Sequence, residues 1–219
     1  MVKFEKEMFD ILNALNEGKM LSKCVVGGSW SMYFYTYIFE GFIPPVATTD
    51  FDIFLPNPST IAKSNISELL TDLDYLREDD TLSGKTRFYS KLGFEIEFLT
   101  SPNRTMSNVV KIKAGNIGAE ALPKLAPAGW NYIKVNFNNL VVNVTSPVSF
   151  VLQKLLINNE RKPEAKKEKD LEAIKYVLKF IKASKKYSDE LNESFQSYPK
   201  KWKKTILEAA SKNNIVLFD

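Results

Sequence analysis

Two aspartates, Asp50 and Asp52, stand where an apolar run predicts a β-strand over residues 51–55. Because side chains alternate along a strand, both carboxylates are expected on one side, while Phe51 and Ile53 point into the core. Two like charges this close repel and raise each other's pKa, and a divalent cation relieves that repulsion. Hard oxygen ligands suit magnesium, so the pair predicts a magnesium site. A solvated strand end bearing acids is the alternative.

A second pair of carboxylates, Glu95 and Glu97, has the same spacing in a predicted strand over residues 94–99. If this strand lies beside the first, one of the two glutamates completes a three-carboxylate cluster with Asp50 and Asp52. The residues alone leave open which glutamate does so. An exposed strand face explains both equally well.

A glycine turn precedes the acids. A short apolar run over residues 24–26 predicts a buried strand, and Gly27, Gly28 and Ser29 follow it. Glycine lets the backbone approach a phosphate closely, and the unpaired N–H groups at a helix start attract anions. Such turns are more often purely structural. The turn therefore gains its weight from standing before the acids.

The composition excludes several classes of enzyme. The 219 residues include no histidine, which rules out Ser–His–Asp catalysis, His-ligated zinc and a histidine base. The single cysteine, Cys24, excludes an internal disulfide framework and a cysteine zinc site, and is typical of the reducing cytoplasm. No apolar stretch approaches the roughly 20 residues of a membrane span, so we expect no membrane partner. An enzyme of this composition must use carboxylates, hydroxyls, lysines and a bound metal ion.

Charge is unevenly distributed. Residues 1–158 carry 15 lysines and arginines against 16 acids, and residues 159–219 carry 15 against 10, within a net charge of +4. A basic segment on a near-neutral body favours an anionic partner such as nucleic acid or polyphosphate. A solvated, lysine-rich helix surface is the alternative, since Lys166, Lys167 and Lys169 alternate with acids at helical pairing distance.

The elements that must position these residues predict an α+β fold. We expect a mixed β-sheet flanked by helices in residues 1–145, and a helical C-terminal region in residues 146–219. Strands are expected over residues 24–26, 51–55, 75–79, 86–91, 94–99, 109–113, 130–135 and 140–144, and helices over residues 4–15, 30–39, 59–73, 148–158, 164–183 and 199–212.

In this order, the pieces resemble the nucleotidyltransferase superfamily with the DNA polymerase beta-like fold. The sequence Gly27-Gly28-Ser29, the Asp50-x-Asp52 strand and a carboxylate on a later strand carry the resemblance. A bacterial nucleotidyltransferase family is more similar still. It has a strand of the pattern (V/I)-acid-F-L-T, here residues 96–100, and a helical segment with two lysines and an aspartate, here Lys154, Lys169 and Asp170. The resemblance covers about residues 22 to 183.

The resemblance implies a role for each of these residues. It implies a two-metal magnesium site held by Asp50, Asp52 and Glu97, and a nucleoside triphosphate cradled by the glycine turn. The implied triphosphate-binding residues are Gly27, Gly28, Ser29, Lys154 and Lys169, with Asp170 orienting a lysine.

The implied reaction transfers a nucleoside monophosphate from a nucleoside triphosphate, such as ATP, to a hydroxyl group. The acceptor could be a tRNA end, a protein in a toxin–antitoxin-like arrangement, or a small molecule such as an aminoglycoside; the basic C-terminal helices favour nucleic acid. The third acid is Glu97 where aspartate is commoner, and the gap from Ser29 to Asp50 is long. A catalytically inactive member that binds nucleotide or a partner protein therefore stays open, as does a plain interaction domain.

Overall fold

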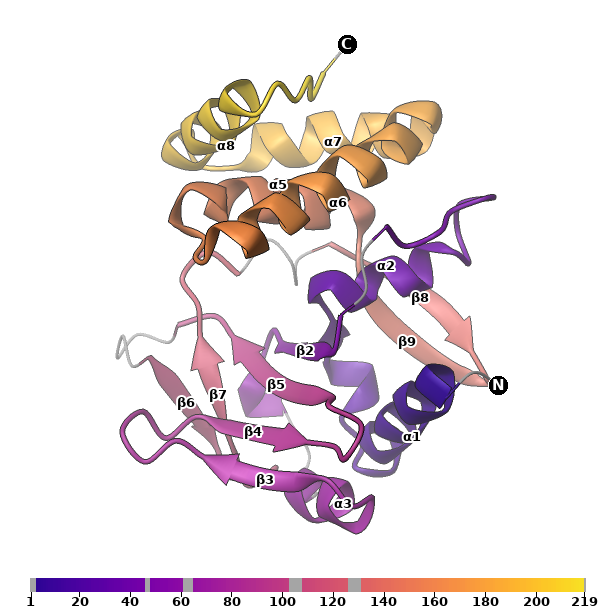
Figure 1. Ribbon diagram of the computed structural model, residues 1–219, viewed down its shortest axis with the longest axis vertical. Helices are drawn as coiled ribbons and strands as arrows, with labels where there is room; N and C mark the ends of the chain where they lie inside the picture. The colour runs from indigo at the N-terminus through magenta and orange to yellow at the C-terminus, as the bar shows by residue number, and fades with distance from the viewer. Residues whose placement is uncertain (1–2, 46–47, 61–64, 103–107, 126–130, 219) are drawn as a thin grey trace.

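The computed structural model describes residues 3–45, 48–60, 65–102, 108–125 and 131–218. A β-sheet with its covering helices forms the lower part of the molecule in Figure 1, and a stack of C-terminal helices lies above it. The predicted mixed sheet with a helical C-terminal region is confirmed. No helix in the described part of the chain combines the length and apolar character needed to cross a bilayer.

The described strands form one mixed sheet. Its main path runs β3-β4-β5-β2-β1-β9-β8, with β7 paired to β5 and β6 paired to β7. The strands are β1 (Val25–Val26), β2 (Asp50–Leu55), β3 (Leu76–Asp79), β4 (Thr86–Tyr89), β5 (Glu95–Thr100), β6 (Val109–Ile112), β7 (Ile117–Ala121), β8 (Tyr132–Phe137) and β9 (Leu140–Thr145).

The pairing of β2 with β5 sets the position of the acids. The two strands are parallel, with Asp50 opposite Glu95 and Asp52 opposite Glu97. Side chains alternate along a strand, so all four carboxylates share one face of the sheet. The opposite face is fully buried and includes Phe51, Ile53, Ile96 and Phe98. Burial of this apolar face fixes the register, because a slip by one residue would turn the acids into the core.

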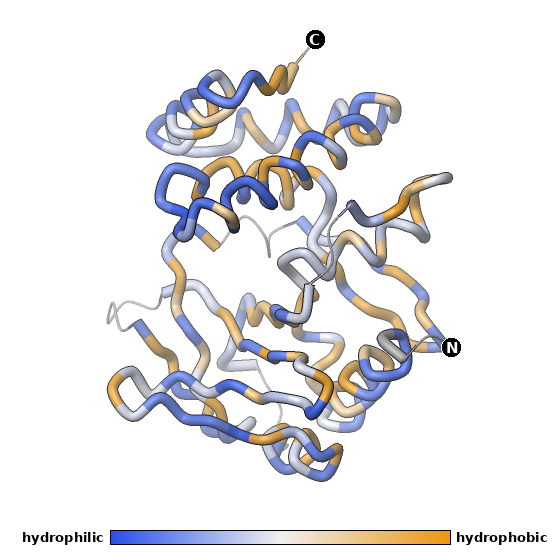
Figure 2. Tube along the Cα trace, in the orientation of Figure 1, coloured by the Kyte–Doolittle hydropathy of each residue, from blue (hydrophilic) through white to orange (hydrophobic). Residues whose placement is uncertain are grey.

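The helices are α1 (Lys3–Glu17), α2 (Ser31–Tyr35), α3 (Ile66–Asp72), α5 (Pro147–Ile157), α6 (Glu164–Ala183), α7 (Lys185–Ser197) and α8 (Lys200–Lys212). Short 3₁₀ turns cover Leu21–Lys23, Gly28–Trp30, Pro58–Thr60 and Asn158–Glu160. Helix α5 lies at the centre of the C-terminal stack and contacts α6, α7, α8 and α2. Hydrophobic positions recur along these helices in Figure 2, as packing inside a stack requires.

Helix α5 begins with a side-chain cap. The hydroxyl oxygen of Ser146 accepts a hydrogen bond from the backbone N–H of Ser149 at 3.1 Å, and Pro147 occupies the first helical position. Proline is tolerated there because its missing N–H would have no partner within the helix. The cap fixes the start of α5 directly after β9.

Two predicted helices differ from the structure. The helix expected over residues 30–39 is α-helical only over Ser31–Tyr35, and the chain continues as turns whose N–H groups bond to carbonyls three or four residues back. The helix expected over residues 59–73 begins at Ile66, where the Asn65 side chain caps it by accepting from the N–H of Glu68 at 3.3 Å. Residues 61–64 and Trp130, at the start of a predicted strand, lie outside the described residues.

Two elements were not predicted. Strand β7 lies between the predicted strands over residues 109–113 and 130–135, in a stretch to which no element was assigned. Its Gly118 weakens the strand signal, but a Cβ there would overlap the Gly84 carbonyl, so only glycine fits. Helix α7 was also missed, although Tyr187, Leu191 and Phe195 recur every four residues and are buried. That spacing is a clear amphipathic signal.

Candidate functional site

Asp52 is the acid whose ionisation the fold disturbs most. Burial raises the pKa of its carboxyl to about 7, and the negative charges of Glu97 and Asp50 add to the rise. Lys154 and Arg161 act in the opposite direction. A carboxylate with such a raised pKa lies where negative charge is already crowded. Strongly perturbed groups of this kind concentrate at functional sites.

Glu97 behaves differently from its neighbour in the register. Lys85 Nζ and Arg87 Nε each lie 2.8 Å from Glu97 Oε1. Burial alone would raise the pKa of Glu97, but these two cations outweigh burial and hold it below the usual range. Burial and the charge of Glu97 raise the pKa of Glu95. Of the two glutamates, Glu97 is therefore the one whose pKa is lowered, and it lies opposite Asp52 in the register.

The glycine turn contacts Asp52 directly. The N–H of Gly27 donates to the Asp52 carbonyl oxygen at 2.9 Å. Gly28 has a φ of +57°, and a Cβ there would overlap Asp52 Oδ2 and lie 2.8 Å from Cγ. Only glycine adopts this positive φ without strain and also leaves room for the Asp52 carboxylate. The turn then opens into a 3₁₀ turn, so Ser29 stands one turn before α2.

One small pocket collects most of the predicted residues. This site pocket has a volume of about 50 Å³. Of the predicted residues, Gly27, Gly28, Glu95 and Glu97 are outside its lining. It is lined by Ser29, Thr48, Asp50, Asp52, Lys154, Arg161, Lys166, Lys169 and Asp170.

A buried carboxylate holds two of the cations in the site pocket. Asp170 Oδ1 lies 2.5 Å from Lys154 Nζ, and Asp170 Oδ2 lies 3.0 Å from Arg161 Nε. The side chains of Asp170 and Lys154 are only 4% and 7% exposed. Two cations share one anion, so this cation clamp, comprising Lys154, Arg161 and Asp170, presents one net positive charge to the pocket. The geometry suits a polyphosphate, since charge-assisted bonds to phosphate are among the stronger polar contacts.

Three lining residues were missed as site residues. Thr48 Oγ1 accepts from the backbone N–H of Asp50 at 3.2 Å and fixes the entry to β2. Lys166 Nζ lies 3.8 Å from Asp50 Oδ2. The sequence indicated only that Lys166 pairs with acids on the surface of its own helix. Arg161 lies between α5 and α6, and no periodic pattern covers that connection. Only a prediction that the basic C-terminal helices lie near the acids could have identified Lys166 and Arg161 as site residues.

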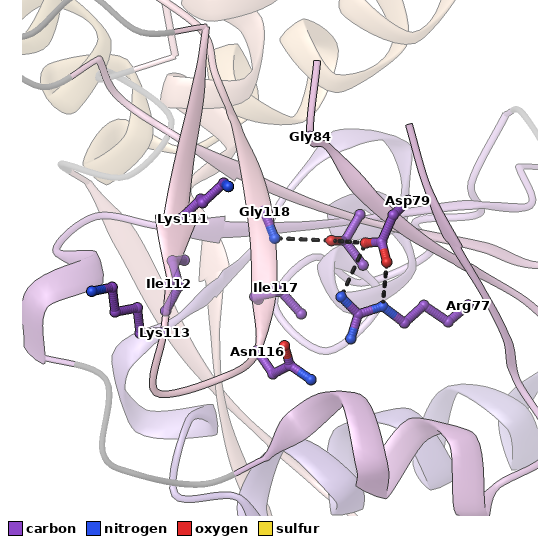
Figure 3. A pocket seen from close by; sticks show the side chains of 10 residues that line it. Arg77, Asp79, Gly84, Lys111, Ile112, Lys113, Asn116, Ile117 and Gly118 are labelled. Atoms are coloured by element: carbon purple, nitrogen blue, oxygen red, sulfur yellow. Dashed lines mark hydrogen bonds and ion pairs between the residues drawn. The ribbon is translucent and has the colours of Figure 1, made fainter. Parts of the chain in front are cut away.

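A larger cavity, of about 320 Å³, lies elsewhere (Figure 3). Its walls are the β3–β4 and β6–β7 hairpins, with the Arg77–Asp79 ion pair at 2.8 Å and a bond from Gly118 N–H to Thr86 Oγ1 at 2.9 Å. Thr86 precedes Arg87 on β4 and therefore points to the face opposite the acids. This cavity is separate from the carboxylates.

The donor set fits magnesium. Asp50 and Asp52 offer carboxylate oxygens on one face of the sheet, and magnesium prefers hard oxygen ligands of this kind. Burial, with the negative charges of Glu97 and Asp50, raises the pKa of Asp52, so a bound cation would favour its ionised form. Gly28 leaves no side chain beside Asp52 Oδ2. No group of three acidic, cysteine or histidine side chains among the described residues is placed to hold a metal together. Magnesium binding, and the part of Glu97 in it, thus stays a prediction.

Comparison with known proteins gives a family match and a fold match. A family model described as Nucleotidyltransferase matches residues 6–199. No curated protein matches the chain. The solution structure of the antibiotic-resistance factor ANT(2'')-Ia is similar at a TM-score of 0.51 and 13% identity, covering 95% of this chain and 96% of that chain.

Two further solved structures are similar. The crystal structure of ANT(2'')-Ia in complex with adenylyl-2''-tobramycin matches at a TM-score of 0.51 and 14% identity, over 90% of this chain and 98% of that chain. An antigenic nucleotidyltransferase-like protein from Paracoccidioides brasiliensis matches at 0.49 and 15%, over 94% and 93%. At these identities the ANT(2'')-Ia likeness shows a shared fold.

We predict that the two glycines of the turn differ in their tolerance of a methyl group. A Cβ on Gly28 overlaps Asp52 Oδ2, whereas a Cβ on Gly27 makes its nearest contact at an ordinary 3.7 Å. Gly28→Ala should lower the free energy of unfolding by about 1–3 kcal/mol, through strain and displacement of Asp52. Gly27→Ala, the matched control, should cost under about 1 kcal/mol. Urea denaturation of both variants measures this, and equal losses would contradict it.

Asp52 should make the metal-free protein less stable as pH rises. Its folded-state pKa of about 7 lies above the ordinary value near 4, so the unfolded chain loses the proton first. The penalty on folding is absent below about pH 4, grows up to about pH 7 and is then constant. Asp52→Asn should therefore raise the free energy of unfolding at pH 8, by about 1–4 kcal/mol, and leave it unchanged near pH 4.

Thermal melts in EDTA across this range measure the effect. The control is Asp74→Asn, because the Asp74 side chain is 82% exposed. If Asp52→Asn and Asp74→Asn show the same pH dependence, the raised pKa of Asp52 is refuted.

Proposed function

The chain belongs to the nucleotidyltransferase family, and from this premise we propose that it transfers a nucleoside monophosphate from a nucleoside triphosphate to a hydroxyl group at the site pocket, with magnesium. The observation that carries the proposal is the opposition of charges across that pocket. Asp50 and Asp52 come from the sheet, and Lys154 and Arg161 come from the helical region. Acids for a metal thus face cations for phosphates.

In the proposed reaction the acceptor hydroxyl gives up its proton to water and its oxygen bonds to the α-phosphorus. The bond from that phosphorus to the bridging oxygen breaks, and pyrophosphate leaves. Bound magnesium would neutralise charge on the phosphates and activate the acceptor hydroxyl. Asp50 and Asp52 are the residues we propose to hold it. Glu97, kept ionised by Lys85 and Arg87, adds a third negative charge beside Asp52.

We assign the phosphates to the opposite wall. Lys154 and Arg161 are fixed by Asp170, and Lys169 also lines the pocket. Ser29 provides a hydroxyl donor for the phosphates. Gly27 and Gly28 have no side chains that would keep the phosphates away from the backbone of the turn. Preorganised donors and cations of this kind stabilise charge at little reorganisation cost, which is the main source of catalysis in phosphoryl transfer.

We favour a small hydroxylated molecule as the acceptor. The exposed lysines Lys175 and Lys179 lie about half a turn around α6 from Asp170 at 100° per residue. They therefore do not share the face of α6 on which Lys166 and Lys169 line the site pocket. ANT(2'')-Ia, which shares the fold, forms a crystalline complex with adenylyl-2''-tobramycin, an adduct of this chemical class. A cytoplasmic location stays a prediction.

A catalytically inactive nucleotide-binding protein is the second candidate. The observation that favours it is the double ion pair of Glu97, whose Oε1 contacts both Lys85 and Arg87. In such a protein the cation clamp would bind nucleotide, but the third acid would stay engaged with its cations. The two candidates differ in one measurable respect, which is turnover.

We predict magnesium-dependent label transfer from α-labelled ATP, CTP, GTP or UTP to an acceptor. Acceptors should include hydroxylated antibiotics, total tRNA and protein. Asp50→Asn/Asp52→Asn should reduce transfer by at least about a hundredfold, because it removes both proposed metal ligands. The matched control is Asp72→Asn/Asp74→Asn, which neutralises two exposed aspartates at the same spacing. Nucleotide binding without transfer to any acceptor would support the inactive candidate, and neither binding nor transfer would contradict both.

We also predict that Asp170 is needed to keep the cations in place. Asp170→Asn retains the size of the side chain but leaves Lys154 and Arg161 without their buried anion. Breaking such a pair should lower the free energy of unfolding by about 3 kcal/mol and raise the Kd for nucleoside triphosphate. Glu164→Gln is the control, because it breaks only an exposed pair with Lys167 on the same helix. Unchanged triphosphate affinity in Asp170→Asn would argue against the clamp.

A further inference from the structure

A second cavity adjoins the site pocket at the C-terminal end of α5. This α5 recess has a volume of about 270 Å³. One wall is apolar and consists of Leu122, Pro123 and Leu125, which follow β7; Ile157, Gln153 and Arg161 stand across from it. An ion pair between Lys124 and Glu160 lies at its rim. The recess thus has an apolar wall beside polar side chains that could fix the orientation of a ligand, a combination found in small-molecule sites.

The recess and the site pocket share a wall residue. Arg161 lines both cavities, and it is the residue common to the two linings in the described chain. Asp170 holds the Nε edge of its guanidinium, and the flat face of a guanidinium can stack on an aromatic ring. None of the acids Asp50, Asp52 and Glu97 lines the recess. A ligand group in the recess is therefore next to a residue of the proposed phosphate site and does not contact the acids. This position suits the base of the nucleotide and not the acceptor hydroxyl, which must reach the acids.

Gln153 supplies the specific polar group. It is partly buried, immediately precedes Lys154 on α5, and has no hydrogen-bond partner within the described part of the chain. Its amide carries both a donor and an acceptor, and this pair matches the donor and acceptor that adenine presents at N6 and N7. An unpaired amide in an apolar recess is costly unless a ligand or water satisfies it.

From these observations we propose that the α5 recess binds the adenine base of ATP, with Gln153 selecting adenine and Arg161 joining the base site to the phosphate site. The proposal rests on the proposed function, because it assumes that the cation clamp binds a triphosphate. It adds a nucleotide preference and a specificity-determining residue that the acids and the glycine turn do not provide.

Calorimetric titration of the whole protein with magnesium and three probes tests the proposal. The probes are ATP, GTP and inorganic tripolyphosphate, which lacks a base. The wild type should bind ATP more tightly than GTP and tripolyphosphate. Gln153→Leu should weaken ATP roughly three- to tenfold, the loss of one or two neutral hydrogen bonds, and should leave tripolyphosphate unchanged. Gln196→Leu, an exposed glutamine on α7, is the matched control and should change neither.

A second variant keeps the test decisive if Gln153→Leu folds poorly. Ile157→Trp places a large ring in the recess from a partly buried position, and should weaken ATP and GTP alike by roughly tenfold or more while tripolyphosphate still binds. Unchanged ATP affinity in both variants overturns the proposal, as does an equal loss for ATP and tripolyphosphate. A wild type that binds tripolyphosphate and all nucleotides equally overturns the base site alone, whereas a wild type that binds none of the probes overturns the proposed function as well.

Discussion

The crowding of four carboxylates on one face of two paired strands is the constraint around which the site is organised. Parallel pairing of β2 and β5 brings Asp50, Asp52, Glu95 and Glu97 to neighbouring positions. Such a face is unstable unless positive charge is brought to it. That charge comes from two directions. Lys85 and Arg87 reach Glu97 from the β3–β4 hairpin and β4, and the cation clamp approaches Asp52 from the helical region.

The two directions of charge give the acids different properties. Glu97 has cations within 2.8 Å and its pKa is lowered. Burial and the charges of Glu97 and Asp50 raise the pKa of Asp52 to about 7, against the opposite effect of Lys154 and Arg161. Asp52 is the one of these two acids that lines the site pocket, so a cation bound there would favour its ionised form.

The sequence predicted the parts of the site whose local pattern reflects their chemistry. The alternating pattern placed Asp50 and Asp52 correctly on one strand and Glu95 and Glu97 correctly on another. That these two strands lie side by side followed from the family resemblance and not from either strand alone. Arg161 could not be found this way, because its role depends on a contact with Asp170 nine residues later. Strand β7 was hidden because its Gly118 is required by the neighbouring hairpin, not by its own strand. Long-range packing decided each of these cases.

The change from strands to helices near residue 146 is a boundary of pattern, but it is not a boundary of packing. Tyr35 of α2 donates from its hydroxyl to the Thr145 carbonyl at 2.9 Å, and its ring packs edge-on against Phe150 of α5 at 6.2 Å. The buried start of α5 is thereby fixed to the segment that follows the glycine turn. Helix α5, which carries Lys154, packs on α2, and β2, which carries Asp52, packs on the 3₁₀ turn that leads into α2. The division into residues 1–145 and 146–219 consequently separates the two walls of one pocket, and each wall needs the other to be in place.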